Sequence, residues 1–378
     1  MSGQSGPEPA SYAAPSYADA GVDVHGEGAA LAGLLGWVRK SFEHRPAGGA
    51  GHVAVDVGYF ASVLELTPEL GLAVSADGVG TKLLVAQLMD RYDTVGIDLV
   101  AMNVNDLVCV GAEPISLLDY VAVERLDGAV LEGIGRGLYE GARQAGVAIA
   151  GGELAQIGAM LRGARPGRAF DLAAVALGLV NPKKINLGQD VQPGDVVVGW
   201  ASSGIHSNGL SLARRALLGE DGAGLDQPLP GGKGETIGEA LLEPTRIYVK
   251  PALELLRRDD VTVTALAHIT GGGFGNMTRI QAMTSYCLDN LPPVPPVFEA
   301  IRRASGAPDT DLYAAFNMGV GFTVTVRPGG ETAAIEAAHR HGFDGWVIGA
   351  ATQAGNERVV VLPKEGLVID DGGFHLLP

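Results

Sequence analysis

The sequence predicts an α+β fold in two halves, and three observations support this. Strand-like and helix-like runs alternate, but several lie close enough along the chain for antiparallel pairing, which disfavours a purely doubly wound sheet. Hydrophobic residues make up 47% of the 378 residues, enough for more than one core. The segment Asn181-Pro182-Lys183-Lys184 interrupts both patterns. We expect a disordered tail over residues 1–16 and two domains, over residues 17–182 and 183–378.

The first half mixes both kinds of element. Apolar residues at helical spacing predict helices over residues 28–42, 81–89, 94–110 and 128–144. Runs of β-branched and aromatic residues predict strands over residues 59–66, 72–75, 115–123, 147–150 and 170–180.

The second half continues this mixture. Strands are predicted over residues 195–200, 261–267 and 322–326, and near Val347 and Val359. Helices are predicted from Ser207, over residues 244–257 and 331–339, and as a short turn after a glycine triplet. A Gly/Pro/Asp-rich surface loop over residues 219–234 and a rigid connector over residues 292–296 complete it.

Composition narrows the class of protein. The net charge is −16, and no dense Lys/Arg cluster occurs, so we expect neither a nucleic-acid partner nor an anionic membrane. Cys109 and Cys287 lie far apart in apolar surroundings, which predicts buried free thiols. The longest apolar run, residues 172–180, is well short of the ~20 residues of a membrane helix, and no signal peptide is readable. A cytoplasmic enzyme is the expectation.

The turn Asp77-Gly78-Val79-Gly80-Thr81-Lys82 joins a strand to a helix. Backbone N–H groups at a helix start can bind phosphate, and Lys82 could add a positive charge. Asp77 is a possible magnesium ligand. The Walker A spacing is missing, so a simple turn and helix cap is the competing interpretation.

The next helix carries polar side chains in an apolar sequence. Asp98 and Asn105 lie almost on one line of the helix, with Asn103 and Asp106 further round. Mg²⁺ prefers such oxygen ligands. A helix with one solvated face is the alternative.

Two further clusters follow strands. Gly151-Gly152-Glu153 places a carboxylate after a short apolar strand, where it could face a ligand or form a turn or helix cap. The loop 202–209, Ser-Ser-Gly-Ile-His-Ser-Asn-Gly, is dense in polar groups. Its His206 could act as a general acid or base, or serve only to cap the following helix.

Glycine-rich segments stand near the end of the second half. Gly271-Gly272-Gly273, within residues 268–276, exposes N–H donors that could bind an anion or form a packing turn. Residues 316–321, Phe-Asn-Met-Gly-Val-Gly, form a similar segment.

In this order, the motifs resemble the family of phosphoribosylformylglycinamidine cyclo-ligases, also called AIR synthetases. The resemblance runs from Tyr17 to about Val361. It includes residues 77–82, 96–106, 111–114, 202–209, 244–250, 268–274 and 316–321. The early motifs are shared with FGAM synthetase, selenophosphate synthetase, thiamine-phosphate kinase and a hydrogenase maturation protein, whereas the last three look particular to AIR synthetase.

The resemblance implies an ATP- and Mg²⁺-dependent ring closure of formylglycinamidine ribonucleotide (FGAM) to aminoimidazole ribonucleotide (AIR), with ADP and phosphate as the other products. It also implies a homodimer, in which N-terminal α+β domains pair into a β-barrel and each C-terminal α/β domain has a mixed sheet. The substrate would be a phosphorylated small molecule.

The resemblance further implies roles for individual residues. His206, Lys82 and Asp106 would be catalytic, and Asp77, Asp106 and Glu153 would bind the metal. ATP would contact Asp77, Gly78, Gly80, Thr81, Lys82 and Asn105. The substrate would contact Ser203, Gly204, His206, Ser207, Asn208, Thr270, Gly271, Gly272 and Asn317.

The sequence departs from the family pattern twice. After Glu153 the family usually continues Thr-Ala-Glu-Met-Pro, whereas this chain reads Leu154-Ala155-Gln156-Ile157-Gly158. The loop over residues 48–60 is also altered. Two alternatives therefore stay open: a divergent paralogue acting as an ATP-dependent small-molecule phosphotransferase, and a non-catalytic scaffold subunit. The general base, the order of substrate binding and the number of metals are not predicted.

Overall fold

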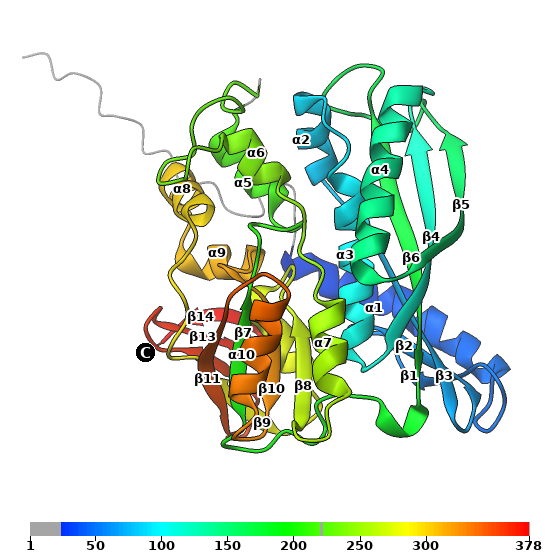
Figure 1. Cartoon of the computed structure of the whole chain (residues 1–378), viewed down its shortest axis with the longest axis vertical. Coiled ribbons are helices and arrows are strands. Elements are labelled where there is room, and N and C mark those ends of the chain that lie inside the picture. The colour runs from blue at the N-terminus through cyan, green and yellow to red at the C-terminus, as the bar shows by residue number, and fades with distance from the viewer. Residues whose placement is uncertain (1–23, 220–221, 378) are drawn as a thin grey trace, which may run out of the picture.

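The computed structural model describes residues 24–219 and 222–377, which form two β-sheets lying side by side, each with its own helices (Figure 1). The strands of the first sheet lie between His52 and Val180, and those of the second between Val196 and Leu376. Both are mixed sheets, as expected. The tail predicted over residues 1–16 lies outside the described residues.

The first sheet has six strands in the order β1-β2-β3-β6-β4-β5, and β4 and β5 are parallel neighbours. Its strands are β1 (His52–Val55), β2 (Ser62–Thr67), β3 (Leu70–Gly78), β4 (Glu113–Val123), β5 (Ala148–Gln156) and β6 (Phe170–Val180). Its helices are α1 (Val24–Val38), the 3-10 helix η2 (Arg39–His44), α2 (Lys82–Met89), α3 (Val95–Cys109) and α4 (Gly128–Ala145).

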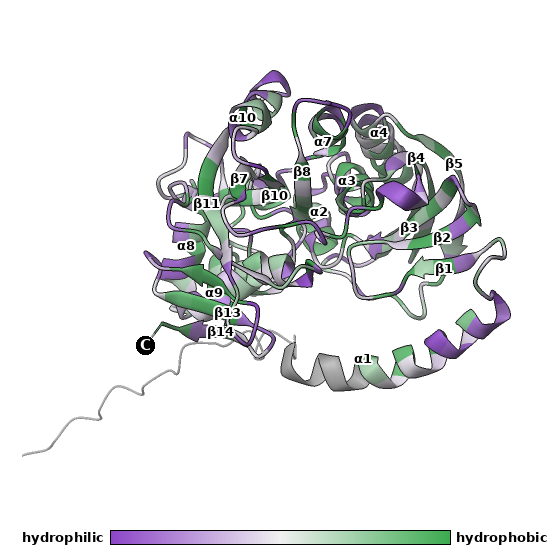
Figure 2. Cartoon of the chain, turned by 90° about the horizontal axis from the view of Figure 1, so that it is seen from below, coloured by the Kyte–Doolittle hydropathy of each residue, from purple (hydrophilic) through white to green (hydrophobic). Residues whose placement is uncertain are grey.

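Helix α3 packs on one face of this sheet and α4 packs on α3. Asp127 caps α4 by accepting hydrogen bonds from the N–H groups of Ala129 and Val130. The two helices approach closely because α3 carries Gly96, where a Cβ would lie 2.3 Å from the backbone nitrogen of Leu138. Helix α1 runs along the outside of the molecule (Figure 2).

The second sheet has eight strands in the order β14-β13-β12-β9-β11-β7-β10-β8. Its strands are β7 (Val196–Ala201), β8 (Val263–His268), β9 (Thr284–Cys287), β10 (Val320–Val326), β11 (Gly345–Gln353), β12 (Val360–Leu362), β13 (Leu367–Asp370) and β14 (Gly373–Leu376). Its helices are α5 (Leu210–Leu217), α6 (Ile237–Leu242), α7 (Val249–Leu256), α8 (Pro296–Ser305), α9 (Asp309–Ala315) and α10 (Glu331–Arg340), and the 3-10 helices are η3 (Pro182–Lys184) and η4 (Gly273–Arg279).

Several expected boundaries are wrong. The helix predicted over residues 244–257 begins only at Val249, because residues 243–248 are in extended or irregular backbone that contacts α3. Strand β5 continues through Gly151, Gly152 and Glu153, which were expected to follow it, because it pairs along β4 as far as Gln156. The prediction missed α6, α8 and α9, each of ten residues or fewer and flanked by loop-forming residues.

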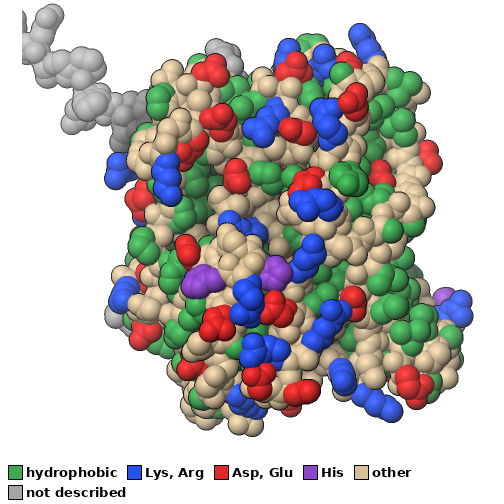
Figure 3. Space-filling view, viewed as in Figure 1, with side chains coloured by type: hydrophobic (Ala, Val, Ile, Leu, Met, Phe, Trp, Pro, Cys, Tyr) green, Lys and Arg blue, Asp and Glu red, His purple; other side chains and the backbone are tan. Residues whose placement is uncertain are grey.

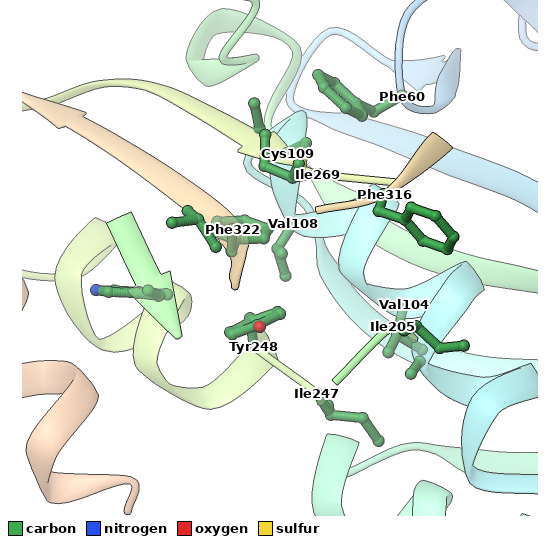
Figure 4. Close-up of a cluster of buried hydrophobic side chains, with 14 of the residues drawn as sticks. Phe60, Val104, Val108, Cys109, Ile205, Ile247, Tyr248, Ile269, Phe316 and Phe322 are labelled. Carbon is green, nitrogen blue, oxygen red and sulfur yellow. The ribbon is translucent and has the colours of Figure 1, made fainter. Parts of the chain in front are cut away.

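An apolar cluster joins the two domains (Figure 4). Phe322 of the second domain lies beside Val108 of α3, and Ile205 lies beside Val104 of the same helix, and all four side chains are buried. The buried Tyr248 lies next to Phe322. Their rings are 5.1 Å apart between centroids. The junction is therefore part of the hydrophobic core and fixes how the sites on the two domains face each other.

Within the described residues of one copy, neither sheet closes into a barrel, and β1 and β5 are the edges of the first sheet. Both cysteines are free thiols, as expected, although Cys287 is only partly buried. Among the described residues, no helix has the length and apolar character needed to cross a bilayer.

Candidate functional site

Polar side chains of α3 connect the two domains. The side chain of Asp98 has no exposed surface, and its Oδ1 accepts hydrogen bonds from Nζ of Lys82 at 2.8 Å and from the N–H and hydroxyl of Thr245 at 2.7 and 2.6 Å. Nζ of Lys82 also donates to the carbonyl oxygen of Glu243 at 2.6 Å. The first domain thus holds the extended segment before α7 by a buried ion pair.

This arrangement bears on the role predicted for Lys82. Burial lowers the pKa of Lys82, and the charge of Asp98 opposes that shift. The side chain of Lys82 has no exposed surface, and its ammonium group is occupied by protein oxygens. Contact with a phosphate would require breaking the ion pair, so the catalytic and ATP-binding roles of Lys82 stay predictions.

Asn105 lies buried nearby on the same helix. Its Oδ1 accepts a hydrogen bond from the N–H of Tyr248 at 2.8 Å, and its Nδ2 donates to the carbonyl oxygen of Arg246 at 2.9 Å. The side-chain amide of Asn105, which was predicted to contact ATP, therefore binds the backbone of the second domain. Its ATP-binding role also stays a prediction.

Two predicted metal ligands lie close together. Asp77 is the last but one residue of β3, where its backbone N–H donates to Oδ1 of Asn103 at 3.0 Å and its Oδ1 accepts from the N–H of Gly78 at 2.7 Å. Burial raises the pKa of Asp77 to about 6, and the nearby charge of Asp106 adds to this rise. Asp106 accepts a hydrogen bond at Oδ1 from Nδ1 of His268, 2.9 Å away.

Such a pair suits Mg²⁺. This ion is usually held by one or two carboxylates together with substrate phosphates, rather than by a cage of protein ligands. No group of three or more His, Cys, Asp or Glu side chains able to hold a metal occurs in residues 24–219 and 222–377. Asp77 and Asp106 therefore fit a magnesium ion that arrives with a nucleotide.

The structure does not bring Glu153 to this pair. Asp77, Ala174, Asp119 and Gly152 are paired in one row across β3, β6, β4 and β5. Side chains in a row share a face of the sheet, and the next residue along a strand faces the other way. Glu153 belongs to the next row, beside Tyr120, so it lies on the opposite face from Asp77.

Asp119, rather than Glu153, shares the face of the sheet with Asp77. Its carboxylate lies over Gly152, where a Cβ would be 2.4 Å from Oδ1 of Asp119. Burial raises the pKa of Asp119. The glycine that the sequence analysis connected with Glu153 is therefore needed for Asp119.

This geometry gives a direct test. Glu153→Gln is expected to change Mg²⁺-dependent ADP binding by no more than about twofold, because surface substitutions away from a site cost within about 0.5 kcal/mol. Calorimetric titration of ADP at several Mg²⁺ concentrations measures this. A loss of tenfold or more would restore Glu153 as a metal ligand.

The loop over residues 202–209 is stabilised around His206. This residue has a left-handed backbone with φ of 60°, and its side chain is fully buried. Its Nε2 accepts a hydrogen bond from the N–H of Ser203 at 3.3 Å, whereas its Nδ1 has no partner. Burial lowers the pKa of His206 well below its ordinary value, and the positive charge of Lys82 contributes. Because Nε2 accepts, the neutral imidazole carries its proton on Nδ1, which is left as a donor without a protein acceptor.

The other predicted substrate residues surround this loop. Oγ of Ser203 donates to the carbonyl oxygen of Pro244, and the hydroxyls of Ser207 and Thr245 lie 3.4 Å apart. Nδ2 of Asn317 donates to the carbonyl oxygen of Gly204 at 2.9 Å. Ser203 and Gly204 also line a cavity of about 290 Å³.

The glycine triplet reaches the same place. A Cβ on Gly271 would lie 3.2 Å from Oδ1 of Asn208, so the two loops are neighbours. Gly272 has a φ of 92°, and Thr270 accepts a hydrogen bond at its Oγ1 from Asn276. Gly273 must be glycine, because its φ is 50° and a Cβ would lie 1.9 Å from the carbonyl oxygen of Tyr313.

The starts of α2 and α5 also meet. The hydroxyl oxygens of Thr81 and Ser211 are 3.2 Å apart across the domain junction. Gly80 has a φ of 69°, which a bulkier residue would disfavour, and a Cβ on Gly78 would lie 3.0 Å from the carbonyl oxygen of Leu172. The turn over residues 77–82 therefore lies against the helix that follows the His206 loop.

Comparison with known proteins matches this two-domain architecture. The N-terminal domain of AIR synthase related proteins matches residues 58–180, and their C-terminal domain matches residues 192–362. A phosphoribosylformylglycinamidine cyclo-ligase of Thermococcus kodakarensis is 45% identical over 361 residues, which cover 96% of this chain and 99% of that protein. The chain belongs to the phosphoribosylformylglycinamidine cyclo-ligase family.

Other members of the cyclo-ligase family are similarly close. The protein of Methanocaldococcus jannaschii is 43% identical over 336 residues, covering 88% of this chain and 91% of its own. Among solved structures, thiamine-monophosphate kinase of Stenotrophomonas maltophilia aligns with a TM-score of 0.57 at 20% identity, over 82% of this chain and 90% of its own. E. coli HypE, a hydrogenase maturation protein, aligns with a TM-score of 0.54 at 21% identity, over 76% of this chain and 81% of its own. These two structures show a shared fold.

Sequence reasoning missed three residues of the site in this cyclo-ligase. Asp119 lies within a strand of ordinary composition, and Thr245 and His268 contact α3 from positions 147 and 162 residues away along the chain. No local spacing signals such contacts. The sequence feature that could have indicated Thr245 and His268 is that both lie in segments that look particular to the family.

Proposed function

We propose that this chain catalyses the ATP-dependent cyclisation of FGAM to AIR, with release of ADP and phosphate, as a step of purine biosynthesis. The observation that carries the proposal is the 45% identity to a named cyclo-ligase over 96% of the chain, covering both halves of the site. A neighbour in the same fold, PurL of Thermotoga maritima, was solved in complex with ADP and aligns with a TM-score of 0.51.

ATP would bind at the turn over residues 77–82. Backbone N–H groups at Gly80 and Thr81 suit phosphate oxygens at the start of α2, whereas the N–H of Gly78 donates to Asp77. Asp77 and Asp106 would hold Mg²⁺ together with these phosphates. The bound ion would neutralise charge on the transferring phosphoryl group.

FGAM would bind between the His206 loop and the glycine triplet. Ser207 and Nδ2 of Asn208, which has no protein partner, offer donors for a ribose phosphate and the formyl group, and Ser203 and Gly204 line the adjacent cavity. Thr270, Gly271 and Gly272 would contact FGAM from the glycine triplet, which neighbours the loop at Asn208. Asn317 stabilises the loop by donating to the carbonyl oxygen of Gly204.

The reaction then follows from placing the two substrates together. The formyl oxygen of FGAM attacks the γ-phosphorus of ATP, and ADP leaves. An amidine nitrogen attacks the activated formyl carbon, and the ring closes as phosphate departs with the former formyl oxygen. Because Nε2 of His206 accepts from Ser203, the neutral ring carries its proton on Nδ1, and His206 would donate from Nδ1 to the formyl oxygen as it departs with phosphate.

An oxygen label tests this proposal. FGAM carrying ¹⁸O in the formyl group should give ¹⁸O-labelled inorganic phosphate and unlabelled AIR, measured by mass spectrometry. Label recovered in water instead would mean that the formyl oxygen is never phosphorylated. The same assay distinguishes a paralogue that phosphorylates another small molecule, because FGAM would then be recovered unchanged.

His206→Ala tests the role of the imidazole. We expect kcat to fall by about 10²–10⁴-fold, as for loss of a general acid or base. His206→Asn is the matched variant, because asparagine tolerates the left-handed backbone but supplies no imidazole. Steady-state kinetics with thermal unfolding curves measure both. A folded His206→Asn protein with wild-type turnover would show that His206 only supports the loop.

A homodimer fits the uncovered face of the first sheet. Leu118, Tyr120, Val175 and Leu179 point away from α3 and α4 and are each 36–41% exposed, although they are large and apolar. Figure 3 shows hydrophobic side chains gathered along this side of the molecule. Two such faces packed together would bury them and bring two six-stranded sheets into the expected barrel. The cytoplasmic location expected from the sequence remains a prediction.

The dimer has its own test. Leu118 and Val175 are directly paired on adjacent strands, so Leu118→Glu with Val175→Glu would place two unpaired charges in the interface. We expect the dimer to dissociate at micromolar concentration, because burying an unpaired charge costs several kcal/mol. Tyr139→Glu on α4, where the tyrosine is also exposed, is the control. Sedimentation that gives a monomer for the wild-type chain would contradict the dimer.

A further inference from the structure

We propose that His268 is a positioning residue that orients the Asp106 carboxylate for Mg²⁺ and nucleotide. It acts from β8 of the second domain on a ligand in α3 of the first. The inference rests on the proposed function, which assigns Asp106 to the metal. Nδ1 of His268 lies 2.9 Å from Oδ1 of Asp106, and the imidazole has no exposed surface.

The neighbouring hydrogen bonds decide which nitrogen carries the proton. Oδ1 of Asn105 accepts from the N–H of Tyr248. The side-chain nitrogen of Asn105, Nδ2, is therefore on the side of the amide away from that N–H. That Nδ2 lies 3.4 Å from Nε2 of His268. An amide nitrogen only donates, so Nε2 must accept. The proton of the neutral ring is then on Nδ1, and His268 donates to Asp106.

The ring itself is held in place. It packs edge-on against Tyr248 at 6.5 Å between centroids, and Phe322 lies 6.3 Å away. Asn276 donates to the backbone carbonyl oxygen of His268 at 3.1 Å and contacts Thr270 with the same nitrogen. A donor fixed on so many sides can fix the carboxylate that it contacts.

The exposed fraction of the carboxylate distinguishes the Asp106–His268 contact from the structural contact made by Asp98. Asp98 also crosses the domain junction, but its side chain has no exposed surface. Asp106 keeps 19% of its side chain exposed while His268 holds one of its oxygens. Partners of this kind behind metal ligands typically change metal affinity 10- to 100-fold when removed.

The position of His268 also connects the two substrates. Thr270 and the glycine triplet begin two residues after His268, at the end of β8. The strand that holds the metal carboxylate therefore also carries one of the loops proposed to bind FGAM. A shift of the second domain away from α3 would release Asp106 and the substrate loop together.

Two isosteric changes test the proposal. Asparagine at position 268 can place an amide N–H near the Nδ1 position, whereas glutamine places its amide near Nε2. We expect His268→Gln to raise the Mg²⁺ concentration for half-maximal ADP binding by about 10–100-fold. His268→Asn should retain binding close to that of the wild type. ADP titration calorimetry at several Mg²⁺ concentrations measures this, after thermal unfolding has shown that each variant is folded.

The outcomes are distinct. Wild-type binding by His268→Gln, or equal losses by both variants, would overturn the proposal. If His268→Gln does not fold, His268→Ala with added imidazole replaces it, and binding that imidazole does not restore would contradict the proposal. Asp106→Asn is measured in parallel. If it binds as the wild type, the metal assignment of the proposed function fails and this inference with it; if it loses binding while His268→Gln does not, only this inference fails.

Discussion

Lys82→Met is expected to lower the free energy of unfolding by about 3–5 kcal/mol, the largest stability effect that we anticipate. The substitution removes the ammonium group and leaves Asp98 charged, buried and without its ionic partner. Oδ1 of Asp98 would keep only the two hydrogen bonds from Thr245, and the carbonyl oxygen of Glu243 would lose its donor. Urea denaturation monitored by circular dichroism measures the loss.

An exposed ion pair serves as the matched control for Lys82. Arg136→Met removes the partner of Glu132 on the surface of α4, where both side chains are more than half exposed. Such i,i+4 pairs contribute about 0.3–0.5 kcal/mol. Equal stability losses for Lys82→Met and Arg136→Met would mean that the buried ion pair does not hold the domains together. The predicted contact of Lys82 with phosphate would then be favoured.

Asp106→Asn should reduce kcat/KM by about 100-fold or more. Losing one charged ligand removes several kcal/mol of stabilisation from the transferring phosphoryl group, and each 1.36 kcal/mol corresponds to tenfold in rate. Asparagine keeps an oxygen that can accept the hydrogen bond from His268, so the fold should persist. Kinetics at several Mg²⁺ concentrations, with thermal unfolding alongside, measure this.

Asp260→Asn is the control for this charge change, because Asp260 is an exposed carboxylate paired with Arg258 outside the site. It should alter kcat/KM by no more than about twofold. An Asp106→Asn enzyme with wild-type kinetics would contradict the assignment of Asp106 to the metal.

The sequence was most informative where the pattern is local. Period-two and helical spacing located β6, α3 and α4 to within a residue or two, because burial on one face determines which residues occur there. It was less informative for α6, α8 and α9, whose short lengths carry few apolar repeats. Glu153 was misplaced because two glycines suggested a turn, whereas Gly152 serves to accommodate Asp119.

The polar face of α3 shows what local patterns leave out. The sequence correctly marked Asp98, Asn105 and Asp106 as unusual in an apolar helix, but unusual polarity has several causes. Oδ1 of Asp98 and the amide of Asn105 are occupied by Lys82, Thr245 and Tyr248, two of which come from the other domain. Only the three-dimensional contacts separate such junction residues from Asp106, which stays partly exposed.

FGAM-dependent release of ADP tests the central claim most directly. The purified chain is mixed with ATP and Mg²⁺, and ADP formation is followed by a coupled assay with and without FGAM. We expect rapid ADP release only when FGAM is present, with one AIR formed for each ADP. ADP formation that does not depend on FGAM, or none at all from a folded protein, would contradict the assignment as a cyclo-ligase.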